Sequence, residues 1–146
     1  MNHPSISDHY GEDHDRLDEL FHHFQTLKSS DRESAVRAFQ EFKAGLERHI
    51  VWEEEILFPA FENKTGMAGG PTQVMRWEHQ QIRGFLEAIA GKLAAGMDAT
   101  GDDEAGLLAV LGPHNHKEEN ILYPMIDQVT GGAERTKIFA EMEKHH

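Results

Sequence analysis

The segment 49–59 reads HIVWEEEILFP, and the segment 114–124 reads HNHKEENILYP. The two segments share a His, two Glu, Ile, Leu, an aromatic residue and Pro in the same order, and they lie 65 residues apart. Residues four apart on a helix project from one face, about 6 Å from each other. His49 therefore shares a face with Glu53, and His114 shares a face with Glu118. The repeat predicts two helices that each present an imidazole and a carboxylate on one side.

Residues that break helices divide the chain into segments of helical length. Gly, Pro, Ser and Asp gather at 27–31, 64–71, 94–103 and 130–132, and no stretch shows the alternation of β-branched residues that indicates a strand. The short connections favour antiparallel neighbours. The sequence therefore predicts an all-α fold, an up-down-up-down antiparallel four-helix bundle with a short extra C-terminal helix. We expect a single domain over residues 1–146.

Each long helix should carry an apolar stripe with residues spaced three and four apart. The stripe of the second helix continues past Glu53 to Ile56 and Ala60, and that of the fourth continues past Glu118 to Ile121 and Met125. The polar residues on the four stripes are His14, His49, Glu53, His79, His114 and Glu118. A buried, unpaired carboxylate costs several kcal/mol, and no Lys or Arg lies on the stripes to compensate it. This pattern indicates a multivalent cation in the core.

Imidazole and carboxylate ligands without thiolate suit iron, manganese or zinc. Six ligands exceed the four of a tetrahedral zinc site, so a site for two metal ions fits best. Carboxylates from opposing helices can bridge such a pair, while the imidazoles bind at its two ends. The neighbouring Glu54 and Glu119 lie about 100° further round their helices. We expect them to support the ligands or to face solvent.

Composition narrows the class of protein further. The chain has 146 residues, a formal charge of −12 and no Cys. The negative charge disfavours nucleic acid and anionic membranes as partners, and the lack of Cys excludes disulfides and thiolate sites. The N-terminal segment resembles no signal peptide, and no apolar run approaches the length of a transmembrane helix. We expect a cytoplasmic protein that binds a small molecule.

The sequence resembles hemerythrin-like (HHE cation-binding) domains over most of its length. The matching elements are the two repeated segments, EDHDRLDELF around His14 and WEHQQIRGFL around His79. The resemblance implies a four-helix bundle that holds two Fe ions in an oxo- or hydroxo-bridged centre. It also implies terminal ligation by the four histidines and bridging by the two glutamates, the full set being His14, His49, Glu53, His79, His114 and Glu118.

The chain departs from the oxygen-carrying hemerythrins at two points. Those proteins have a further His one turn from the first on the third helix, where this chain has Met75 or Arg83. They also bridge with an Asp five residues after the fourth-helix His, where Glu119 stands here; the internal repeat favours Glu118, with Glu119 as the alternative. The remaining ligand is left open between Glu78, Tyr10, water and none.

These observations predict a protein that binds or senses dioxygen, or a related small oxidant, at an open iron position. The alternatives are a di-iron enzyme acting on peroxide or nitric oxide, and iron storage or handling; we favour binding without turnover and assign no catalytic residue. The oligomeric state is left open. The pair Gly112–Pro113 predicts a kink or break in the fourth helix. His145 and His146 are native or the remnant of a purification tag.

Overall fold

The computed structural model of the chain describes residues 5–144, and every regular element in that range is helical. The elements are α1 (Ile6–Leu27), α2 (Arg32–Trp52), the π-helical turn η1 (Glu53–Leu57), α3 (Phe58–Thr65), α4 (Pro71–Ala94), α5 (Gly101–Lys117), the π-helical turn η2 (Glu118–Leu122), α6 (Tyr123–Val129) and α7 (Gly132–Glu143). The prediction of an all-α fold is confirmed, and a short C-terminal helix is present. His145 and His146 lie outside the described residues.

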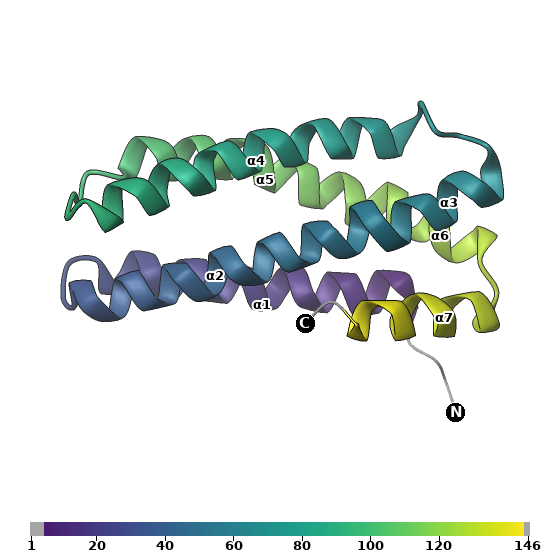
Figure 1. Ribbon diagram of the computed structural model, residues 1–146, viewed down its shortest axis with the longest axis horizontal. Coiled ribbons are helices and arrows are strands. Elements are labelled where there is room, and N and C mark those ends of the chain that lie inside the picture. The colour runs from purple at the N-terminus through teal and green to yellow at the C-terminus, as the bar shows by residue number, and fades with distance from the viewer. Residues whose placement is uncertain (1–4, 145–146) are drawn as a thin grey trace.

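The long helices lie lengthwise beside one another (Figure 1). α1 packs along α2, and α4 packs along α5. The turn between α1 and α2 and the turn between α4 and α5 lie at one end of the molecule, whereas the connection from α3 to α4 lies at the other end (Figure 1). α7 folds back at that second end. No helix among residues 5–144 is both long enough and apolar enough to cross a membrane.

Local sequence signals set the ends of these helices. Ser5 and Asp31 cap the starts of α1 and α2, where their side chains accept hydrogen bonds from the amides of Asp8 and Ser34. Such caps satisfy amides that have no partner within the helix. At the end of α3, Gly66 adopts φ of 74°, a left-handed conformation that glycine tolerates best.

The apolar stripes build two hydrophobic clusters with a polar layer between them. One cluster is formed by α1, α2, α4 and α5, and includes Phe24, Phe39 and Leu86. The other lies around α3, α6 and α7, and includes Phe61 and Ile126. A large apolar side chain contributes about 1.5–3 kcal/mol when it is fully buried. The layer between the clusters is where the predicted His and Glu residues lie.

The 65-residue repeat is also a repeat of local structure, in the two π-helical turns and the helices that follow them. η1 and η2 begin at Glu53 and Glu118 and have the same length, and each is followed by a helix with Pro at its second residue. Pro59 and Pro124 have no amide hydrogen, and a proline ring clashes with the carbonyl four residues earlier. The helix widens just before each proline, so that the amide of Phe58 bonds to the carbonyl of Glu53.

These π-helical turns correct the stripes predicted beyond the two glutamates. Ile121 was expected to continue the buried seam of the fourth helix, but it is 55 % exposed, and Leu122 and Tyr123 are buried in its place. The same shift buries Leu57 and leaves Ile56 only partly buried. One extra residue per turn advances the buried face by one position, which a period of 3.6 residues does not anticipate.

The kink or break predicted at Gly112–Pro113 is wrong as to the break, whereas a kink without a break stays a prediction. α5 continues as α-helix through Pro113 to Lys117, and the first departure from α-helical bonding is η2, which begins at Glu118. Gly112 and Pro113 are both exposed. The carbonyl that the proline leaves without its usual donor is that of Ala109, which also lies on the exposed side of α5. Water can therefore replace the lost hydrogen bond.

Glu104 is a buried carboxylate remote from the polar layer, and it joins α1 to α5. It accepts hydrogen bonds from Lys28 Nζ at 2.5 Å, from Thr100 Oγ1 at 2.5 Å and from Gln25 Nε2 at 3.1 Å. Burial raises the pKa of Glu104, but these three donors outweigh burial and lower its pKa from the ordinary 4.5. The ionised form therefore stabilises the folded state.

We expect Glu104→Gln to lower the free energy of unfolding at neutral pH by about 1–3 kcal/mol, because it leaves charged and polar donors without their acceptor. A carboxyl whose pKa is lowered on folding stabilises the protein above its unfolded pKa, and the effect is lost as the pH falls through its folded pKa. The difference between wild type and variant should therefore shrink below pH 4.5. Urea unfolding followed by circular dichroism measures it.

Asp98→Asn is the matched control, because Asp98 pairs with Arg32 while 71 % of its side chain is exposed. An exposed ion pair contributes about 0–1 kcal/mol. If Glu104→Gln and Asp98→Asn lowered the free energy of unfolding equally, the conclusion that the ionised Glu104 stabilises the folded state would be contradicted.

Candidate metal centre

The structure brings all six predicted ligand residues together in the polar layer between the two hydrophobic clusters. Each histidine comes from a different long helix, and each glutamate is the first residue of a π-helical turn. All six side chains are almost completely buried, with 0–2 % of their surface exposed: His14, His49, Glu53, His79, His114 and Glu118.

The ligand atoms form two overlapping groups that share Glu118. One group consists of Glu53, His79, His114 and Glu118, and the other of His14, His49 and Glu118. Within each group, one nitrogen or oxygen of every residue lies within 4.8 Å of the others. Two groups that share a carboxylate could hold two cations side by side.

Glu118 and Glu53 lie between the histidine pairs. Glu118 Oε1 is 3.2 Å from His14 Nε2 and 3.2 Å from His114 Nε2, so one oxygen faces an imidazole of each pair. Glu53 divides its two oxygens, since Oε1 is 3.0 Å from His79 Nε2 and Oε2 is 3.7 Å from His49 Nε2. Both carboxylates are thus positioned to reach either end of the site.

The other nitrogen of each imidazole, Nδ1, lies against a second carboxylate from a neighbouring helix. His49 pairs with Asp13 at 2.8 Å and His114 with Glu78 at 2.9 Å, whereas His79 pairs with Glu54 at 2.7 Å and His14 with Glu119 at 3.3 Å. An ionised carboxylate only accepts hydrogen bonds, so Nδ1 must carry the proton. Each Nε2 then faces the centre and is the nitrogen available to a metal, an arrangement that is general among metal-binding histidines.

Basic side chains hold three of these outer carboxylates in place. Arg16 donates to Asp13 at 2.9 Å, Lys117 donates to Glu78 at 2.5 Å, and Arg83 donates to Glu54 at 3.4 Å. These cations lie around the buried layer and balance part of its negative charge. The positions of the imidazoles therefore depend on residues that do not face the centre.

Without a bound metal, the buried imidazoles and carboxylates shift one another's pKa values. Burial by itself lowers the pKa of His49, but the charge of Glu53 and the hydrogen bond to Asp13 raise it to about 10. Burial also lowers the pKa of His79, while Glu53 and Glu54 raise it to about 9. Burial raises the pKa of Glu53, but His49 holds it well below its ordinary value. A cation in the site would compete with these protons.

The donor set fits a bound metal. Glu118 Oε2 is buried and has no hydrogen-bond partner among the described residues, although an unpaired carboxylate oxygen is costly to bury. Four imidazoles and two carboxylates, without a thiolate, suit iron, manganese or zinc. The orphaned oxygen and the inward Nε2 atoms are what a cation would satisfy.

Tyr123 also reaches this centre, although the helix period of the sequence does not predict it. Its hydroxyl donates to Glu53 Oε2 at 2.7 Å and lies 3.1 Å from Glu118 Oε1. In an α-helix, a residue five positions after Glu118 would point about 140° away. The wider turn η2 brings Tyr123 onto the face of Glu118 instead. The signal available in the sequence was Pro124, the repeat of Pro59.

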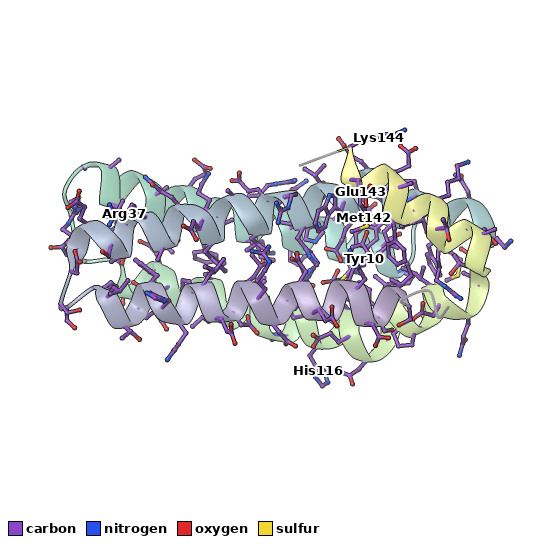
Figure 2. The ribbon with its side chains drawn as sticks, turned by 90° about the horizontal axis from the view of Figure 1, so that it is seen from below. Tyr10, Arg37, His116, Met142, Glu143 and Lys144 are labelled. Carbon is purple, nitrogen blue, oxygen red and sulfur yellow. The ribbon has the colours of Figure 1, made fainter. Side chains whose placement is uncertain are left out.

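The other residues that were considered lie elsewhere. The hydroxyl of Tyr10 donates to Met142 Sδ at 3.1 Å rather than to a carboxylate of the centre, and Figure 2 shows the two side chains pointing toward each other. Glu78 and Glu119 contact Nδ1 atoms, on the outer side of the imidazoles. His116 projects outward from the bundle (Figure 2).

The comparison with protein families agrees with this geometry. No curated protein and no solved structure gives a significant match to the chain. The family described as the hemerythrin HHE cation binding domain matches residues 5–146. That span contains all six converging histidines and glutamates. The chain therefore belongs to the hemerythrin HHE cation-binding domain family.

Proposed function

We propose that this chain is a non-heme di-iron protein that binds or senses dioxygen, or a related small oxidant, without turnover. The observation that carries the proposal is the convergence of four Nε2 atoms on two fully buried carboxylates, one of which keeps an oxygen without a partner. Membership of the HHE cation-binding family supports iron as the metal. The sharing of Glu118 between the two ligand groups supports a pair of ions rather than one.

The proposed ligand roles follow the two ends of the layer. His14 and His49 bind one iron, and His79 and His114 bind the other. Glu53 and Glu118 bridge the pair from opposite halves of the chain. This proposal includes the antiparallel up-down-up-down arrangement of the long helices and a single domain over residues 1–146.

The protein supplies burial and orientation. The hydrophobic clusters on either side keep bulk water from the carboxylates, and the outer carboxylates hold the protons on Nδ1. When bound, the irons would supply a redox-active centre with a coordination position for a small oxidant. A cytoplasmic location and the lack of a nucleic-acid partner remain predictions from composition.

One observation favours a second candidate, a di-iron oxidoreductase that consumes peroxide or nitric oxide. One turn from His79, where oxygen carriers have a further imidazole, Met75 is buried in the apolar cluster and Arg83 donates to Glu54. Neither position 75 nor position 83 therefore supplies a second imidazole beside His79. An iron with fewer protein ligands is more open to reaction. Iron storage is a third possibility.

We expect the protein, expressed in iron-supplemented medium, to contain close to two irons per chain. His49→Ala and Glu53→Ala should each lose most of this iron, because each removes a ligand and leaves other buried polar groups unpaired. Metal analysis of the purified protein measures the content. His116→Ala is the control, since His116 lies in the same repeated segment but is exposed.

Wild-type protein without bound metal would refute the proposal. Far more than two irons per chain would favour storage instead.

We expect Asp13→Asn to weaken metal binding by about 10–100-fold with all six ligands in place, because Asp13 orients His49 through Nδ1. Competition with a chelator measures the affinity. Asp15→Asn is the control, because Asp15 is an exposed acidic residue of the same helix. Equal affinities in wild type and Asp13→Asn would show that the hydrogen bond does not support the ligand.

We expect the reduced, iron-loaded protein to give visible absorption bands with dioxygen that disappear under vacuum. Reversible bands indicate binding or sensing, because the oxidant leaves unchanged. Rapid conversion to a stable ferric form, or turnover of added peroxide, would instead favour the oxidoreductase.

A further inference from the structure

The two ends of the site differ at the equivalent positions 58 and 123, where one end has Phe and the other has Tyr. Phe58 and Tyr123 each follow a π-helical turn and precede a proline, and both are fully buried. The ring of Phe58 stacks on His79, with centroids 5.9 Å apart and an angle of 9° between the planes. Tyr123 brings a hydroxyl to the opposite end, beside His14 and His49. The repeat therefore provides one phenol oxygen, at one end.

The phenol oxygen of Tyr123 lies near four ligand atoms at comparable distances. They are Glu53 Oε2 at 2.7 Å, Glu118 Oε1 at 3.1 Å, His49 Nε2 at 3.2 Å and His14 Nε2 at 3.3 Å. Two of these atoms belong to carboxylates and two to imidazoles, so the oxygen adjoins the whole ligand set of this end.

Ligands around one octahedral metal ion would have a similar spacing. In an octahedron each ligand has four neighbours, at a separation of √2 times the metal–ligand distance. For imidazole and carboxylate ligands at about 2.0–2.2 Å, the separation is about 2.8–3.1 Å. The four distances from Tyr123 lie close to this range, so the hydroxyl is placed where a fifth protein ligand would lie.

The other candidates for that ligand are engaged elsewhere. The hydroxyl of Tyr10 bonds to Met142, and the carboxylate of Glu78 bonds to His114 Nδ1 and to Lys117. Neither oxygen faces the ligand atoms at the His14 end. Of the three residues, only Tyr123 places an oxygen beside the ligand atoms of His14 and His49.

Resting on the proposed di-iron function, we propose that Tyr123 is a phenol ligand to the iron held by His14 and His49. The iron at the His79 and His114 end then has one protein ligand fewer, beside the apolar ring of Phe58. The two irons are inequivalent, and the small oxidant has its coordination position at the Phe58 end.

The test uses the visible spectrum of the ferric, iron-loaded protein, because tyrosinate bound to ferric iron gives a charge-transfer band. The chain has two tyrosines, so the source of a band is either Tyr10 or Tyr123. We expect the band in wild type, its loss in Tyr123→Phe and its retention in Tyr10→Phe. Iron content should stay close to two per chain in Tyr10→Phe, and the band of Tyr123→Phe is compared with that of wild type per bound iron. Tyr10 is a suitable control because it is buried in the same apolar cluster.

Iron-loaded wild type without the band would overturn the inference and leave the di-iron function intact. So would a band that survives in Tyr123→Phe. If Tyr123→Phe does not fold or hold iron, resonance Raman excitation within the wild-type band decides, since phenolate ring modes support the ligand and their absence overturns it. Wild type that binds no iron would refute the proposed function and this inference with it.

Discussion

Two carboxylates with no exposed surface, those of Glu53 and Glu118, impose the constraint on which the rest of the structure depends. An isolated buried charge is too costly for a domain whose net stability is small. The surrounding bundle therefore supplies compensation in layers, with imidazoles around the carboxylates, acidic residues around the imidazoles and basic residues around those. The apolar core is split into two clusters to make room for this arrangement. A single polar layer thus organises all the long helices.

Most of the fold follows from patterns in the sequence. In α1 and α4 the predicted His14 and His79 lie on the buried face, because regular helices obey the period of 3.6 residues on which the prediction relies. The six converging residues were also identified, since polar residues on apolar stripes stand out. Their positions in the structure agree with that selection, whereas ligation itself remains a proposal.

The parts that were missed depend on the departures from that period. Ile121 was placed on the buried side and Tyr123 was overlooked, because one π-helical turn moves the buried face by one residue. The proline that favours this turn was visible in the sequence, but its effect depends on which side of the helix is buried. Pro113, which was expected to break α5, is tolerated on an exposed face, whereas Pro59 and Pro124 follow widened turns. The carboxylates on Nδ1 depend on which helices become neighbours, and helix periodicity does not specify that.

The repeated segment in the two halves of the chain has an evolutionary consequence. A helix hairpin that carried one copy of the repeat could build the same cradle by pairing with a second copy of itself, as symmetric dimers do. Both ends of such a dimer would have the same aromatic residue. When both copies are in one polypeptide, each can change separately. One end can then have Phe while the other has Tyr. The covalent link between the halves is what permits their specialisation.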